Sequence, residues 1–275
     1  MCIGLFIPCF IDAFFPEVGI ATLELLERFG HEVVYPRDQT CCGQPMANSG
    51  FNAECADTEA SFVHNFSGFE YVVAPSGSCV HHVRDNFDAI EQTPEVKEVR
   101  ARTFELVEFL HDIEKVEAFP WARFPHRVGL HNSCGTLRRL KHAAPSELHE
   151  PFYSKPMDLL SKVEGIEFVT PARPDECRGF GGTFSVFEEA VSAKMGFDKV
   201  ADHARAGAEY IVSADSSCLM HQQGCTGSRG VSETSLNPAP SRIRLHARWI
   251  GPLAPNSAMT MAGQVQRSYK PPTAG

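Results

Sequence analysis

The chain has 275 residues, of which 43% are hydrophobic and 10% aromatic, so it can bury a sizeable core in one large or two small domains. Its net charge of −9 disfavours nucleic acid and anionic membrane surfaces as main partners, because both attract a basic face. The apolar start lacks the basic segment and cleavage site of a signal peptide, and no apolar run reaches the length of a bilayer. We therefore expect a soluble, cytoplasmic protein with at most peripheral membrane association.

Short β-rich runs alternate with helical runs, which predicts βαβ units and parallel sheets. The predicted elements of the first half are a strand over 2–8, a helix over 17–29, a strand over 32–35, a helix over 53–66 and a strand over 71–74. Strands over 127–130, 167–170 and 210–213 repeat this order in the second half. The predicted fold class is α/β, with two similar βαβ-type lobes from an internal duplication and a mainly parallel sheet in each.

Each of these strands leads into a loop or turn that carries cysteine, and the loops match between the halves. The matched cysteines are Cys9 with Cys134, Cys41 with Cys177, and Cys79 with Cys218. Because the carboxyl ends of parallel strands meet at one edge of a sheet, we expect the thiols of each half to converge. The first set is Cys9, Cys41, Cys42 and Cys79, and the second is Cys134, Cys177 and Cys218.

The repeat also predicts the domain boundaries. A first cysteine-rich domain covers residues 1–119 and a second, degenerate one covers 126–250, with the end of a helix and a linker over 109–125. Residues 244–250 are interpreted as the remnant of a terminal strand and helix. Residues 251–275 are expected to form a disordered tail.

Four motifs carry a resemblance to a known family. They are Cys41-Cys42-Gly43-Gln44-Pro45, Pro75-Ser76-Gly77-Ser78-Cys79, Gly179-Phe180-Gly181-Gly182-Thr183-Phe184-Ser185 and Ser213-Ala214-Asp215-Ser216-Ser217-Cys218-Leu219-Met220-His221. The pattern resembles the cysteine-rich "CCG" domain, and most of all the lactate-utilisation protein A family. The same domain occurs in a cysteine-rich subunit of heterodisulfide reductase and in the iron–sulfur subunit of glycolate oxidase.

The resemblance implies an iron–sulfur cluster, of the 4Fe-4S type, in the first lobe. Its ligands would come from the first set of thiols, joined by His82, which stands where the heterodisulfide reductase relatives have the last cysteine of Cys-x-x-Cys. Thiolates are soft ligands suited to such clusters, which usually need four of them.

The second lobe departs from the family pattern, because Arg178 stands where a second cysteine is usual. The remaining candidate ligands are Cys134, Cys177, Cys218 and His221. Three thiolates and one imidazole would suit tetrahedral zinc as well as a cluster, so the metal of this lobe is left open between iron–sulfur and zinc. Cys2, Cys55 and Cys225 have no counterparts and are interpreted as packing residues.

The function that this resemblance implies is electron transfer within a multi-subunit oxidoreductase that oxidises L-lactate, or a similar 2-hydroxy acid, to pyruvate. No ferredoxin-like Cys-x-x-Cys-x-x-Cys-x-x-x-Cys-Pro segment is present, so a separate ferredoxin-type iron–sulfur subunit and a third small subunit are the expected partners. The sequence identifies no catalytic residue, and we expect no activity from the chain alone. The alternatives are a zinc-binding structural or interaction protein and a thiol–disulfide enzyme that uses the Cys41-Cys42 pair.

Overall fold

The computed structural model describes residues 1–227 and 244–246, and these form two four-stranded sheets whose strand pairs are all parallel. Their strand orders, β2-β1-β3-β4 and β6-β5-β7-β8, are the same order in each half of the chain. The strands are β1 (Cys2–Leu5), β2 (Glu32–Val34), β3 (Tyr71–Ala74), β4 (Thr103–Glu105), β5 (Arg127–Leu130), β6 (Glu167–Val169), β7 (Tyr210–Val212) and β8 (Arg244–His246). The predicted α/β class with two similar lobes is confirmed.

The duplication extends to the strand register. Ile3 of β1 faces Val33 and Tyr71, and its counterpart Val128 of β5 faces Phe168 and Tyr210. Strand β4, over 103–105, was not among the predicted strands. The expected strand near residue 244 is present as β8, whereas the helix expected after it and the predicted tail over 251–275 lie outside the described residues.

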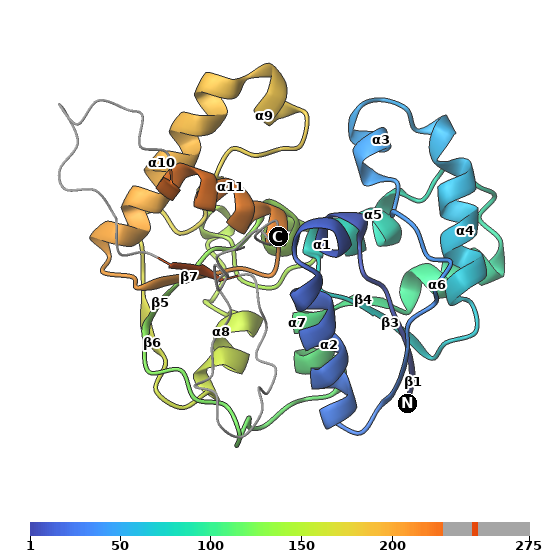
Figure 1. The fold of residues 1–275 in the computed structure, drawn as a ribbon, viewed down its shortest axis with the longest axis horizontal. Helices are drawn as coiled ribbons and strands as arrows, with labels where there is room; N and C mark the ends of the chain where they lie inside the picture. Colours follow the sequence, from blue (N-terminus) through green and yellow to red (C-terminus); the bar gives the residue numbers. More distant parts are fainter. Residues whose placement is uncertain (228–243, 247–275) are drawn as a thin grey trace, which may run out of the picture.

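Helices connect the strands, and Figure 1 shows the two lobes side by side with helices packed around each sheet. The first lobe contains α1 (Cys9–Phe14), α2 (Pro16–Arg28), α3 (Gln44–Asn48), the 3-10 helix η1 (Ala53–Cys55), α4 (Ala56–Phe66), α5 (Gly77–Asn86), α6 (Pro94–Ala101), α7 (Leu106–Glu108) and the π-helical turn η2 (Phe109–Ile113). The second contains η3 (Gly135–Arg139), η4 (Ser146–Leu148), α8 (Lys155–Ser161), α9 (Phe184–Phe187), α10 (Glu189–Arg205) and α11 (Ser216–Gly227).

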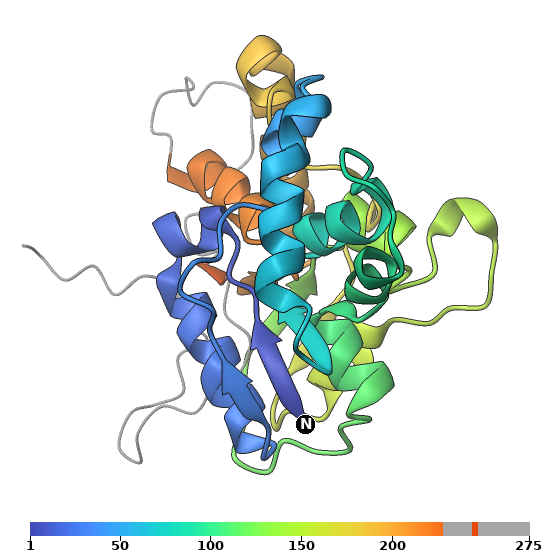
Figure 2. The ribbon, with the colours of Figure 1, turned by 90° about the vertical axis from the view of Figure 1, so that its right-hand side faces the viewer.

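Helices α2 and α4 lie on opposite sides of the first sheet (Figure 2). Val73 of β3 packs in the same hydrophobic cluster as Leu25 of α2. Its neighbours Val72 and Ala74 pack in a second cluster, with Phe66 of α4. Successive side chains of a strand point to opposite faces of the sheet, so the apolar residues of β3 pack against α2 on one face and against α4 on the other.

Local sequence explains where several helices begin. The Thr93 hydroxyl accepts a hydrogen bond from the backbone N–H of Val96 at the start of α6, and Ser154 caps α8 in the same way through Met157. A proline at the first or second helical position follows each of these caps, where its missing N–H costs nothing. None of the helices described is both long and apolar enough to cross a lipid bilayer.

One hydrophobic cluster joins the two lobes. It includes Ile3 and Leu5 of β1, Val128 of β5 and Val212 of β7, all of them buried. The predicted linker contributes to the same cluster through Phe109, Leu110, Val116, Phe119, Ala122 and Phe124. The segment between the lobes is therefore part of the core, and burial of its apolar side chains stabilises the arrangement of the two sheets.

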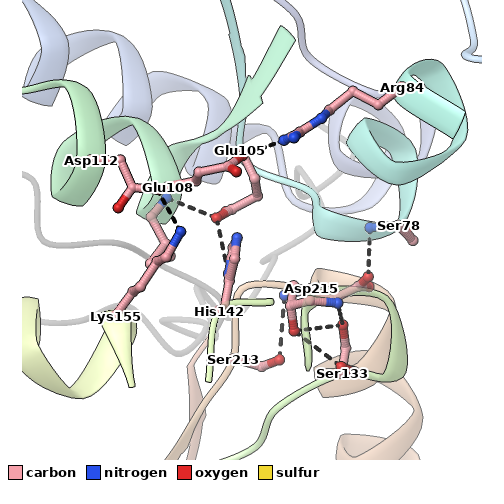
Figure 3. Close-up of polar contacts among 12 residues, drawn as sticks. Ser78, Arg84, Glu105, Glu108, Asp112, Ser133, His142, Lys155, Ser213 and Asp215 are labelled. Carbon is pink, nitrogen blue, oxygen red and sulfur yellow. Dashed lines mark hydrogen bonds and ion pairs between the residues drawn. The ribbon is translucent and has the colours of Figure 1, made fainter. Parts of the chain in front are cut away.

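Buried polar groups also meet where the lobes pack (Figure 3). Glu105, at the end of β4, lies 3.7 Å from Nδ1 of His142 in the second lobe, and both side chains are buried. Burial raises the pKa of the Glu105 carboxyl well above its usual value and lowers the pKa of His142 to about 3. Burial therefore favours the uncharged form of both groups, because burying an ion pair is costly.

The start of α5 touches the second lobe directly. The backbone N–H of Gly77 donates to the carbonyl of Ala214 at 3.3 Å, and that of Ser78 donates to Oδ2 of Asp215 at 3.3 Å (Figure 3). A Cβ atom at position 77 would lie 2.1 Å from Cγ2 of Thr136, whose side chain is buried. Glycine is required here because the buried side chain of Thr136 occupies the space that a Cβ would need.

Gly77→Ala is expected to destabilise the protein by about 1–3 kcal/mol, although alanine is intrinsically favoured over glycine in helices. Thr136→Ser removes the clashing methyl and keeps the hydroxyl that donates to the carbonyl of Ser133, so the double variant should recover most of the loss. Thermal unfolding of the wild type, both single variants and the double variant measures the coupling. Equal melting temperatures for Gly77→Ala with and without Thr136→Ser would show that this contact does not limit the approach of the lobes.

Candidate metal centre

Four thiols of the first lobe meet at the carboxyl edge of its sheet. Cys9 begins α1 after β1, Cys41 and Cys42 lie in the loop after β2, and Cys79 lies in the first turn of α5 after β3. The Cys9 thiol donates to Sγ of Cys41 at 3.4 Å, and the Cys42 side chain hydrogen-bonds with both Cys41 and Cys79. The predicted convergence of these four cysteines is what the folded chain shows.

Gly43 shapes the turn that brings the two adjacent cysteines together. Its φ of +87° lies in the left-handed region, and its backbone N–H donates to Sγ of Cys41 at 3.4 Å. The space beside it is lined by Nε2 of His82 and Sγ of Cys55, which lie 3.6 Å and 3.5 Å from where a Cβ at position 43 would be. These distances are ordinary van der Waals contacts, so the positive φ is the reason for glycine at this position.

The thiols share protons. Hydrogen bonds from Cys42 and then from Cys9 hold the pKa of Cys41 well below its ordinary value. The same contacts raise the pKa values of Cys9 and Cys42 above theirs. These hydrogen bonds and the backbone N–H of Gly43 therefore favour the thiolate form at Cys41 over that of its neighbours.

His82 completes this group as a neutral imidazole. It is only 1% exposed, and burial is the main reason that its pKa falls to about 4. Its Nε2 is buried and has no hydrogen-bond partner among the described residues. His81, by contrast, points to Asp85 on its own helix at 2.7 Å. A buried imidazole nitrogen without a partner is costly unless a ligand occupies it, so His82 has the chemistry of a metal-binding residue.

These side chains fit an iron–sulfur group in donor chemistry and in proximity, since soft thiolates are its usual ligands. Within the described ranges, no three His, Cys, Asp or Glu side chains are already arranged around a single ion. Loading a metal group thus requires the thiols to release their shared protons and to reorient, as is general for sites that bind their metal as thiolates.

The second lobe repeats this geometry with one change. The Cys134 side chain hydrogen-bonds to Cys177, whose pKa falls to about 5, mainly through that contact. Gly179 matches Gly43, since its φ is +91° and its N–H donates to Sγ of Cys177 at 3.3 Å. Cys218 is buried in α11, in the place that Cys79 takes in α5. The position equivalent to Cys42 is occupied by Arg178.

His221, the remaining candidate ligand, lies against a neighbouring helix. Its Nε2 is 3.0 Å from the hydroxyl of Ser192 in α10. Its Cε1 and Sγ of Cys225 both approach Gly196 of the same helix, at 2.8 Å and 2.5 Å from where a Cβ would stand. His221 and Cys225 thus pack together on α10, and the hydrogen bond to Ser192 occupies one ring nitrogen.

Sequence reasoning missed one neighbour of the first site. Cys55, interpreted as a packing residue, is 1% exposed and its thiol donates to the carbonyls of Phe51 and Gly43, at 3.3 Å and 3.6 Å. It therefore supports the turn that carries Cys41 and Cys42. No local pattern marks it, because it has no counterpart in the second repeat.

Comparison with known proteins agrees with this duplicated arrangement. The cysteine-rich domain family CCG matches the chain twice, over residues 3–84 and 128–223. Its relatives include proteins named lactate utilization protein A. The relative from Exiguobacterium sp. is 40% identical to this chain, and the match covers 81% of this chain and 91% of the relative. The relative from Halalkalibacterium halodurans is 38% identical, with 82% of this chain and 89% of the relative covered. The relative from Bacillus subtilis is 37% identical, with 82% of this chain and 92% of the relative covered.

Two CCG domains in tandem define the class of protein. Within that class, the chain belongs to the lactate utilization protein A family.

Proposed function

We propose that this chain is an iron–sulfur electron-transfer subunit of a cytoplasmic oxidoreductase complex that converts L-lactate, or a similar 2-hydroxy acid, to pyruvate. The observation that carries the proposal is the meeting of Cys9, Cys41, Cys42 and Cys79 beside the unpartnered imidazole of His82. The names of its relatives support the link to lactate.

The residues of the first lobe would hold and tune the group. The four thiols, with His82 as a further donor, would bind a cluster of the 4Fe-4S type, which accepts and releases electrons one at a time. The Gly43 N–H already donates to the Cys41 sulfur, and such hydrogen bonds adjust the reduction potential of a cluster. Cys42 and Cys79 are buried whereas Cys9 is exposed, so one side of the site is shielded and the other is open to a partner.

A ferredoxin-type iron–sulfur subunit and a third small subunit are the partners that the proposal requires. In the part of the chain that the structure describes, no further group of thiols accompanies the two matched sets. The sequence contains no ferredoxin segment. Electrons would therefore reach or leave the first lobe through another polypeptide.

The test is analysis of iron, zinc and acid-labile sulfide in anaerobically purified protein. Iron with a matching amount of sulfide, together with a brown colour, is the expected result. A colourless zinc protein would replace the proposal with a structural role. A metal-free protein with a titratable Cys41-Cys42 dithiol would replace it with thiol–disulfide chemistry, for which the low pKa of Cys41 would be the physical basis.

A further inference from the structure

Arg178 is buried to an unusual degree for a cation. It is 8% exposed, and its Nε is buried without a hydrogen-bond partner among the described residues. Its Nη2 donates a hydrogen bond to Oγ of Ser217 at 3.3 Å. A guanidinium is rarely buried unless a negative group compensates for the water it loses.

The compensating groups are sulfurs, the carboxylate of Asp215 and the ring of Phe180, whose centroid lies 5.4 Å from the guanidinium. The Arg178 side chain hydrogen-bonds to Cys177, and Cys134 and Cys218 also interact with it electrostatically. The negative charge of Asp215 also attracts the guanidinium, and Ser217 bridges the two groups: its hydroxyl accepts from Nη2 of Arg178 at 3.3 Å and donates to Oδ1 of Asp215 at 2.6 Å. An arginine guanidinium is not deprotonated in proteins, so this site holds a permanent positive charge.

Arg178 in the second lobe occupies the position that Cys42 occupies in the first lobe. Cys42 hydrogen-bonds with Cys41 and Cys79, and Arg178 lies in the same way beside Cys177 and next to Ser217, the neighbour of Cys218. The glycine turns that follow both residues have the same conformation. The substitution therefore removes one ligand and also places a positive charge among the three thiols that remain.

We propose that the second lobe is a metal-free site in which the guanidinium of Arg178 takes the place of a metal group among Cys134, Cys177 and Cys218. A metal cation or cluster would have to displace a charged side chain that is held by the Cys177 sulfur and the Ser217 hydroxyl, and it would find only three thiols. If the first lobe carries the cluster proposed above, the chain holds one redox group and not two.

The test compares Arg178→Cys with Arg178→Lys in the full chain, each reconstituted anaerobically with iron and sulfide and analysed for iron, sulfide and zinc. Lysine keeps the charge and adds no thiol, so it should leave the metal content of the wild type unchanged. Cysteine removes the charge and restores the fourth thiol, so the metal content should rise about twofold if the first lobe is loaded. If the first lobe binds no metal, the metal content of Arg178→Cys should rise from none to about one group per chain. A failure of the proposed function can therefore be distinguished from a failure of this inference.

A second measurement does not depend on making a new site. Cys177→Ser in the otherwise unchanged chain should leave iron and sulfide at the wild-type level. Loss of metal in Cys177→Ser would overturn the inference. So would equal metal content in Arg178→Cys and Arg178→Lys when both unfold at the wild-type temperature.

Discussion

Cys42→Ser is expected to remove most of the iron and sulfide from anaerobically purified protein, with occupancy falling by about tenfold or more. Cys42 lies at the centre of the first set of thiols, because its side chain reaches both Cys41 and Cys79. A serine hydroxyl is a hard donor that remains protonated at neutral pH and is a poor ligand for iron–sulfur groups. Iron and sulfide analysis with the visible absorption spectrum measures the effect.

Cys225→Ser provides the matched control. Cys225 is partly buried like several site cysteines, but it packs on α10, where its thiol approaches the carbonyl of Ala193. Its replacement should leave the metal content unchanged. If both variants lose iron equally, the loss reflects general destabilisation and the first lobe is not the metal centre.

The isolated chain is expected to show no turnover of L-lactate above the buffer background, and activity should appear only when the ferredoxin-type subunit and the third subunit are added. Oxidation of a 2-hydroxy acid removes two electrons and two protons, and cofactors usually carry such chemistry. The sequence contains no recognisable flavin or dinucleotide motif, and an ordinary cluster accepts one electron at a time.

The measurement uses the anaerobically reconstituted chain with L-lactate and a one-electron dye, with and without the partner subunits. The Cys42→Ser chain in the complete mixture shows whether turnover depends on the first lobe. Turnover by the single chain at the rate of the complete set would contradict the electron-carrier role. It would instead make Cys41, Cys42 and their neighbours a catalytic centre.

Much of the first site was predictable because it follows from local pattern and one rule of topology. Alternating strands and helices imply parallel sheets, and parallel sheets place every strand-end loop on one edge. Cys9, Cys41, Cys42 and Cys79 therefore had to converge once β1, β2 and β3 paired, which they do. The same rule placed Cys134 beside Cys177.

Other features were not predictable because they depend on contacts between distant residues. The segment over 109–125 has the prolines of a linker, yet Phe109 and Phe119 enter the core that both sheets share. The sequence around Gly77 indicates only the beginning of a helix. Glycine is required at this position because the side chain of Thr136 approaches it from the other lobe. These contacts depend on how side chains pack in the folded protein. The periodicity of apolar residues predicts which face of an element is buried, but it does not predict which other element that face will contact.

The sequence alone thus determined that the chain has two repeated α/β lobes, and that one lobe retains four thiols while Arg178 interrupts the set in the other. Only the tertiary structure decided that Arg178 turns inward among the remaining thiols and that His82 is buried with a free nitrogen. The reason is that strand order follows from local periodicity and chain connectivity. The burial and charge state of a single side chain depend on every group that surrounds it.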